Sequence, residues 1–123
     1  MPLYQITVLK NLAKKKIKRN KGLTLKLNNN PDILKTISSS NNKPLITVGF
    51  AYETNDYFIN AKKKLKEKKC DFIVLNYPLK NNVVLNGNLN NGGIFNKQGN
   101  YYEIGNVTKT VFANRIINHV LQF

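Results

Sequence analysis

The sequence predicts an α/β fold in which a partial parallel sheet carries flanking helices and is followed by a C-terminal hairpin and helix. Two observations support this prediction. Short apolar runs alternate with segments of helical pattern, and the run PLITVGF at 44–50 lacks the polar alternation of a strand that faces water. Strands that alternate with helices favour a parallel sheet, and a continuous apolar run is typical of a strand covered on both faces.

Bulk composition limits the possible classes of protein. With 123 residues, of which 41% are hydrophobic, the chain is long enough for one domain with its own core. The single cysteine, Cys70, excludes an internal disulfide framework, and no continuous apolar stretch near the N-terminus matches a secretory signal or a membrane span. We therefore expect a cytoplasmic protein without a membrane partner. Its net charge of +14 favours polyanionic ligands such as nucleic acid or a nucleoside triphosphate.

The first elements follow from local patterns. In LTLKL (23–27) leucine alternates with polar residues, which predicts a half-buried strand. Asn30 suits the N-cap of the next helix, Pro31 its first position, and Asp32 its positive end. The strand of the PLITVGF run then follows, with Gly49 at its carboxyl end.

A longer helix is predicted from Thr54 or Asn55 to about Lys69. Its apolar stripe is expected to pack on the sheet and consists of Phe58, Ala61 and Leu65. At 100° per residue, Lys64 and Lys68 fall together on one border of this stripe. The other border also carries lysines, namely Lys62, Lys66 and Lys69.

The remaining segments complete the predicted order. DFIVLN (71–76) predicts a strand reached through a right-handed parallel crossover. GGIFNKQGN (92–100) is rich in turn formers and suggests a hairpin or loop, and GNLNNGGI (87–94), which has the spacing of a phosphate-binding loop without its lysine, is interpreted as a plain loop. From Thr108, a last helix is expected to dock through a broad apolar face made of Phe112, Ala113, Ile116, Ile117, Val120 and Leu121.

A ligand site is expected where parallel strands end. Ligands of open parallel sheets bind beyond the carboxyl ends of the strands, where Phe50 and Asn76 are predicted. A helix beginning at Pro31 would also present free N–H groups to an anion there. Lys64 and Lys68 lie one turn apart and would hold two phosphates of one ligand; the alternative is a solvated basic helix face.

Four further sequence blocks follow one another along the chain, namely KIKR (16–19), LTLKL (23–27), NPDIL (30–34) and VGFAYET (48–54). In their order and approximate spacing they resemble the blocks of phosphopantothenate-cysteine ligases, the nucleotide-dependent ligases of coenzyme A biosynthesis. DFIVLN and TKTVFANRI (108–116) extend the resemblance over the chain from about Lys14. We therefore expect 1–123 to be a single domain, the C-terminal half of a ligase-like domain, with a poorly matched leader at 1–13.

The resemblance implies a Rossmann-like three-layer fold and a reaction in two steps. CTP, with Mg²⁺ carried by its triphosphate, activates the carboxylate of 4'-phosphopantothenate as an acyl-cytidylate, which the amine of cysteine then attacks. Fixed cations stabilise the charge that develops on phosphate oxygens during such a transfer. The nucleotide-contacting residues implied by the resemblance are Arg19, Pro31, Asp32, Ile33, Leu34, Phe50, Lys64 and Lys68. No catalytic residue and no protein metal ligand is assigned.

Some positions depart from the family pattern. Arg19 stands in place of a lysine, Tyr52 in place of a small residue, and Tyr77 in place of a frequent aspartate. The first half of the ligase domain, with its glycine-rich segment, is not recognisable in the chain. We therefore expect weak nucleotide binding and no activity of the chain alone.

Three functions stay open at this point. The first is a ligase half completed by a separate N-terminal half or by a homodimer. The second is an inactive remnant, with or without a CTP site. The third is a small basic nucleic-acid-binding protein that uses Lys14–Lys21 and the lysine-rich helix. The choice between CTP and ATP is also open.

Overall fold

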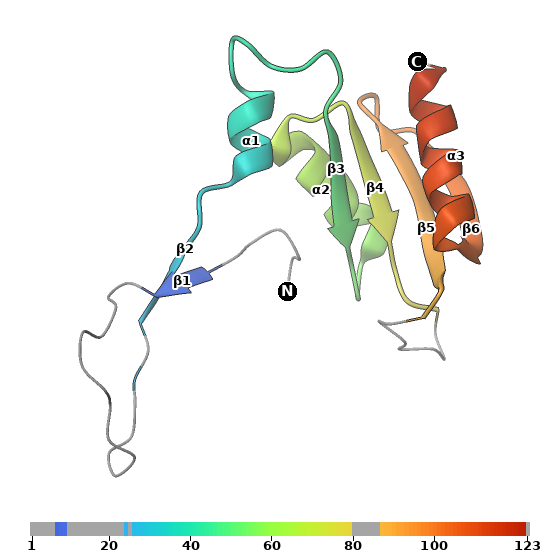
Figure 1. Ribbon diagram of the computed structural model, residues 1–123, viewed down its shortest axis with the longest axis horizontal. Coiled ribbons are helices and arrows are strands. Elements are labelled where there is room, and N and C mark those ends of the chain that lie inside the picture. The colour runs from blue at the N-terminus through green and yellow to red at the C-terminus, as the bar shows by residue number, and fades with distance from the viewer. Residues whose placement is uncertain (1–6, 10–23, 25, 80–86, 123) are drawn as a thin grey trace.

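The computed structural model describes residues 7–9, 24, 26–79 and 87–122. Their elements are, in chain order, β1 (Thr7–Leu9), β2 (Leu27–Asn29), α1 (Ile33–Ser38), β3 (Val48–Tyr52), α2 (Tyr57–Lys68), β4 (Phe72–Asn76), β5 (Leu89–Asn96), β6 (Tyr101–Thr108) and α3 (Lys109–Leu121). A four-stranded sheet in the order β3-β4-β5-β6 forms the centre, and β1 pairs with β2 in a separate antiparallel sheet (Figure 1).

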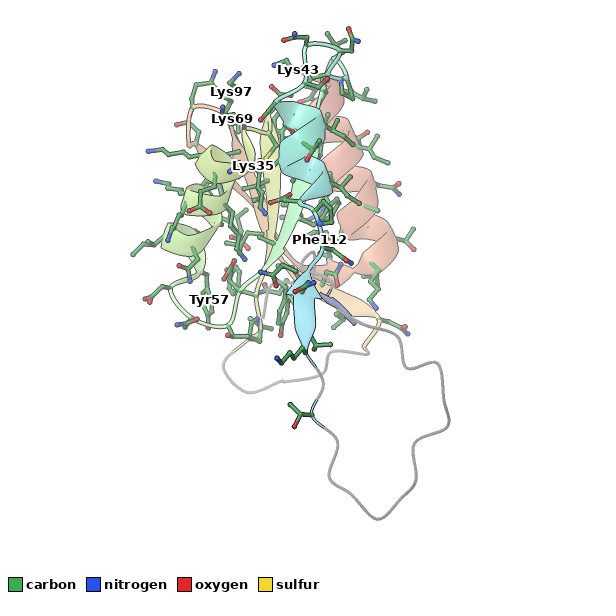
Figure 2. All side chains as sticks on the ribbon, turned by 90° about the vertical axis from the view of Figure 1, so that its left-hand side faces the viewer. Lys35, Lys43, Tyr57, Lys69, Lys97 and Phe112 are labelled. Atoms are coloured by element: carbon green, nitrogen blue, oxygen red, sulfur yellow. The ribbon has the colours of Figure 1, made fainter. Side chains whose placement is uncertain are left out.

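The central sheet is mixed. β3 and β4 are parallel and are joined through α2, whereas β4 pairs with β5, and β5 with β6, in antiparallel registers. In Figure 2 the sheet stands between α2 on one face and α3 on the other, with α1 in front near the edge strand β3. The predicted α/β fold, with a partial parallel sheet, flanking helices and a C-terminal hairpin and helix, is confirmed.

The core consists of two apolar clusters, one on each face of the sheet. The cluster under α2 contains Ala51, Ala61, Leu65, Cys70, Ile73, Leu75 and Phe95. The cluster under α3 contains Phe72, Val74, Ile94, Ile104, Phe112 and Ile116. Successive residues of β4 alternate between the two clusters, and burial of each large side chain contributes about 1.5–3 kcal/mol. The prediction of a strand at DFIVLN is therefore confirmed, and this strand is buried on both faces of the sheet. Cys70, directly before it, is also buried.

α1 begins later than the sequence pattern indicated. Asp32 is its N-cap, because its carboxylate accepts a hydrogen bond from the N–H of Lys35 at 3.1 Å, and Ile33 is the first helical residue. The prediction of Asn30 as N-cap and Pro31 as first helical residue is therefore wrong. Asp32 takes the cap because a carboxylate satisfies an N–H group of the first turn directly.

α2 also begins later than expected. Its N-cap is Asp56, which has a left-handed backbone (φ 43°), so the helix starts at Tyr57 rather than after Thr54 or Asn55. The expected stripe packs only in part. Ala61 and Leu65 are buried, whereas Phe58 is 42% exposed at the rim, where its ring meets Tyr101 edge-on at 4.8 Å.

β2 differs from the half-buried strand predicted for LTLKL. Only Leu27 of that run lies in β2, and its side chain is exposed, as are its two successors in the strand. The other leucines of the run, Leu23 and Leu25, lie outside the described residues. Because β2 pairs with β1 instead of joining the central sheet, Leu27 receives no cover from the helices that flank that sheet.

β3 continues past the glycine that was predicted to end it. Gly49 is the second residue of this strand, and a Cβ there would lie 2.7 Å from Cδ2 of Leu34 in α1. The glycine therefore permits α1 to approach the sheet. The prediction that the PLITVGF strand is covered on both faces is wrong at Phe50. Its side chain is 63% exposed, so one face of the strand is uncovered there.

β5 occupies the segment that was interpreted as a loop. Its consecutive glycines, Gly92 and Gly93, lie at a shift in the strand register. A Cβ on Gly92 would overlap the carbonyl of Leu75, and a Cβ on Gly93 would overlap the carbonyl of Tyr102. The glycines thus permit close strand packing rather than a turn, and the loop interpretation of GNLNNGGI is wrong. The hairpin itself is confirmed, with its turn between Asn96 and Tyr101.

α3 begins where the sequence placed it. The hydroxyl of Thr108, the N-cap, accepts a hydrogen bond from the N–H of Val111 at 3.3 Å. Phe112, marked in Figure 2, and Ile116 are buried against the sheet, but Ile117 and Leu121 are exposed. The docked face is therefore narrower than predicted. No helix in the described ranges combines the length and the apolarity that a membrane crossing requires.

Candidate functional site

The two lysines singled out by helical position are the least exposed lysines of α2. The side chain of Lys64 is 14% exposed and that of Lys68 is 6% exposed. Both belong to the helix that contacts α1 and β3. In contrast, Lys62, Lys66 and Lys69 are exposed, and Figure 2 shows Lys69 at the end of α2 opposite Tyr57. The predicted division of these lysines into two sets is confirmed by their burial.

Lys64 contacts an acidic residue that sequence reasoning did not select. Its ammonium forms an ion pair with the carboxylate of Glu53, whose side chain is 9% exposed. Glu53 directly follows β3, and its N–H donates to the carbonyl of Asn76 at 3.0 Å, which ties together the carboxyl ends of β3 and β4. Its place immediately after the VGFAY strand was the signal available in the sequence, because ligands gather at that edge.

Lys68 contacts the residue that caps α1. Its ammonium forms an ion pair with the carboxylate of Asp32, whose side chain is 30% exposed. Burial raises the pKa of Asp32, but the contact with Lys68 and the hydrogen bond from the N–H of Lys35 together lower it below its ordinary value. Asp32 is therefore held in its charged form at neutral pH.

The start of α1 is not the open anion site that was expected from a helix beginning at Pro31. α1 has six residues, and the carboxylate of Asp32 already occupies the N–H of Lys35 at its first turn. An incoming anion would meet this carboxylate before the helix. The cap of α1 is thus itself an anion, and binding of a ligand anion at this helix start stays a prediction.

The other predicted contacts are scattered around this cluster. Pro31 and Ile33 are exposed, and Leu34 packs against the core beside Gly49. Arg19 lies outside the described residues. The structure therefore brings Asp32 together with Lys68. Of the residues next to Asp32, Pro31 and Ile33 face solvent and Leu34 packs in the core.

Phe50 is separated from the two lysines. Its strand neighbours Gly49 and Ala51 face α1 and α2, so Phe50 points to the opposite face of the sheet, as side chains alternate along a strand. There it stands exposed at the edge of the sheet. The structure does not bring Phe50 to Lys64 and Lys68.

Tyr77 is held at the carboxyl end of β4 by aromatic contacts. Its ring stacks on Tyr57, the first residue of α2, with centroids 4.7 Å apart and an interplanar angle of 16°. It also lies 5.9 Å from the ring of Phe58. The residue that departs from the family pattern at this edge therefore fastens the segment after β4 to α2.

A family model described as the DNA/pantothenate metabolism flavoprotein C-terminal domain matches residues 8–123. The chain belongs to this family. The resemblance to phosphopantothenate-cysteine ligases that the sequence blocks indicated is thereby confirmed at the level of the family. Members of the flavoprotein C-terminal domain family include curated proteins and a solved structure that are similar to this chain.

Two curated relatives are both called coenzyme A biosynthesis bifunctional protein CoaBC. The one from Borreliella burgdorferi is 38% identical over 111 residues, which cover 88% of this chain and 27% of that protein. The one from Bacillus subtilis is 35% identical over 103 residues, which cover 84% of this chain and 25% of that protein. The chain thus spans about a quarter of the length of these relatives.

A solved structure shares the fold. The crystal structure of the C-terminal domain of coenzyme A biosynthesis bifunctional protein CoaBC superposes with a TM-score of 0.62 and 29% identity. The match covers 78% of this chain and 43% of that chain. The mixed sheet with helices on both faces is therefore an arrangement that this chain shares with the solved domain. The chain matches less than half of that domain.

Proposed function

We propose that the chain supplies the CTP-binding part of a phosphopantothenate-cysteine ligase, which joins 4'-phosphopantothenate and cysteine through an acyl-cytidylate in coenzyme A biosynthesis. The observation that carries this proposal is the burial of Lys64 and Lys68 on one side of α2, beside the end of β3 and the start of α1. Membership of the family and the names of the relatives support it.

The two lysines would act on the phosphates of the nucleotide. Two ammonium groups one helical turn apart match the spacing of adjacent phosphates, and in a largely buried site their charge is screened less than at an open surface. Negative charge that develops on the phosphate oxygens during cytidylate transfer would be stabilised there. Magnesium, in this proposal, arrives as part of the substrate with the triphosphate.

Calorimetric titration with CTP, and with ATP for comparison, tests the nucleotide site. We expect saturable binding that prefers CTP and is lost in a Lys64→Ala/Lys68→Ala variant. The matched control is Lys62→Ala/Lys66→Ala, which removes the same charge from the same helix at the same spacing but on its exposed side. Binding in the control should stay within about threefold of the wild type, since exposed charges contribute little.

The opposite results would refute the nucleotide assignment. Equal loss in both double variants would indicate general attraction to a basic surface rather than a site. Binding of RNA that falls steeply with salt and is not competed by CTP would favour the nucleic-acid function instead.

We also propose that the active ligase needs a complementary N-terminal part of the domain, docked at the outer edge of β3. Among the described residues β3 pairs only with β4, and Phe50 is exposed beside that edge. Unpaired edge strands are templates for pairing with another strand. The match covers 43% of the solved relative's domain, so more than half of that domain lies outside the match. A corresponding N-terminal part would be available to cover the edge of β3.

Mixing experiments test this second point. The chain and a separately produced N-terminal part of the ligase domain should co-elute in size-exclusion chromatography. With 4'-phosphopantothenate and Mg²⁺ present, they should release pyrophosphate from CTP only when mixed. Co-elution without pyrophosphate release would identify an inactive remnant. A homodimer that does not take up the added part would refute the docking at β3.

A further inference from the structure

The two lysines of the candidate site each contact a carboxylate, so the four groups carry no net charge despite the strongly basic chain. We propose that Glu53 and Asp32 occupy, in the nucleotide-free protein, the places that phosphate groups take when a nucleotide binds. Binding then exchanges two carboxylates for two phosphates. This inference rests on the proposed function, because it concerns the same lysines.

The exchange follows from the chemistry of the partners. A lysine ammonium has three N–H donors, and it donates equally well to the oxygens of a carboxylate and of a phosphate. Removing one partner of a largely buried ion pair is costly, because a charge in low dielectric loses its compensation. A phosphate that arrives as the carboxylate leaves avoids this cost for Lys64 and for Lys68.

The two pairs differ in how easily the carboxylate can leave. Asp32 is partly open to solvent, with 30% of its side chain exposed. Glu53 is 9% exposed, and its backbone is fixed to Asn76, so its release requires movement of the segment that leads into α2. That segment ends at Asp56, which has a left-handed backbone and makes no side-chain capping hydrogen bond. Glu53 is therefore the stronger barrier to binding.

The exchange also sets which ligands bind. A ligand with one phosphate replaces one carboxylate and leaves the other pair intact, whereas a polyphosphate satisfies both lysines at once. The pairs of Lys64 and Lys68 therefore favour di- and triphosphates over monophosphates. Removing Glu53, the stronger barrier, should therefore increase this discrimination, whereas removing a purely structural ion pair would leave it unchanged.

The test compares the intact chain with three variants that each remove one negative charge. Glu53→Gln and Asp32→Asn keep the shape of the side chain, and an asparagine at position 32 still offers an oxygen to cap α1. Glu67→Gln is the control, because Glu67 lies on the exposed side of α2 in a 3.9 Å pair with Lys63. Each protein is titrated calorimetrically with CTP, CMP and inorganic tripolyphosphate, after thermal unfolding has shown that it is folded.

We expect Glu53→Gln to bind CTP about tenfold more tightly than the wild type, the equivalent of about 1.4 kcal/mol. Asp32→Asn should show a smaller gain, and Glu67→Gln should stay within about twofold because exposed pairs contribute little. The ratio of CMP to CTP dissociation constants should rise in Glu53→Gln, because CTP no longer has to displace Glu53, whereas CMP can already bind the wild type by displacing Asp32 alone. If that variant does not fold, the same comparison is made with Asp32→Asn.

The outcomes separate this inference from the function on which it rests. Unchanged or weaker CTP binding in both folded carboxylate variants, with binding still lost in Lys64→Ala/Lys68→Ala, would overturn the exchange and leave the CTP site intact. Tighter binding of tripolyphosphate in Glu53→Gln, without CTP binding by any chain, would support the exchange and refute the CTP assignment. Failure of every folded chain to bind tripolyphosphate would overturn the exchange.

Discussion

The ammonium of Lys68 contacts the carboxylate of Asp32, and this ion pair joins the end of α2 to the start of α1. The same carboxylate accepts a hydrogen bond from the N–H of Lys35 in the first turn of α1. One acidic side chain therefore both caps a helix and compensates a lysine that is almost fully buried. Changes at Asp32 should separate these two roles.

Asp32→Ala should destabilise the chain more than Asp32→Asn. Alanine removes both the cap and the partner of Lys68, whereas asparagine keeps an oxygen for the N–H of Lys35. The expected difference in the free energy of unfolding is about 1 kcal/mol, the usual contribution of an N-cap. Urea denaturation of the two variants measures it. Equal stabilities would show that the cap contributes nothing to α1.

The pH dependence of stability should report the charge of Asp32. Its pKa lies below the ordinary value of 3.8 in the folded protein, because the contact with Lys68 and the N–H of Lys35 outweigh the effect of burial. The ionised carboxylate therefore stabilises the fold above that ordinary value, and this contribution is lost as the pH falls through the lower folded pKa. The gap in urea stability between the wild type and Asp32→Asn should be present at neutral pH and shrink as the pH falls below the ordinary value of 3.8 and through the lower folded pKa. A gap that persists in strong acid would contradict this account.

Gly93→Ala should destabilise the sheet severely. The added methyl group would overlap the carbonyl of Tyr102 and lie 2.6 Å from the ring of Tyr101. We expect a loss of about 3 kcal/mol, at the upper end of typical overpacking costs. Gly99→Ala is the control, because its methyl group meets open space and costs only the strain of a left-handed backbone, about 1 kcal/mol. Similar losses in the two variants would argue against the tight packing of β5.

Cys70 should be unreactive in the folded chain. Its side chain is buried, and burial raises the pKa of its thiol above the ordinary value of 9.0. Since the thiolate is the reactive form, a chromogenic disulfide reagent at neutral pH should label Cys70 only after urea unfolds the protein. Labelling of the folded chain at the rate of free cysteine would contradict the burial.

Phe50→Ala should leave the stability of the isolated chain nearly unchanged, within about 0.5 kcal/mol, because the side chain is mostly exposed. Phe72→Ala, at a fully buried position of β4, should cost about 3–5 kcal/mol. Thermal unfolding of both variants gives the comparison. A large loss in Phe50→Ala would mean that this ring already packs within the chain and is not available to a partner or ligand.

Local patterns in the sequence were sufficient for much of the fold. The apolar run of DFIVLN predicted β4, Thr108 marked the start of α3, and helical spacing separated Lys64 and Lys68 from the exposed lysines. The same reasoning failed for Gly92 and Gly93, since glycines that permit close strand packing carry the composition of a turn.

The partners of the two lysines could be decided only by the tertiary structure. Asp32 lies 36 residues before Lys68, and Glu53 lies on a different element from Lys64, so no periodicity relates the members of either pair. Likewise, the alternation of β3 turns Phe50 away from the lysines, although the family resemblance implied one nucleotide site for all three. The sequence determined which residues carry charge and which stripes are apolar, because these depend on residue type and local spacing. The packing of α1, α2 and β3 decided which charges meet, because that depends on contacts between distant segments.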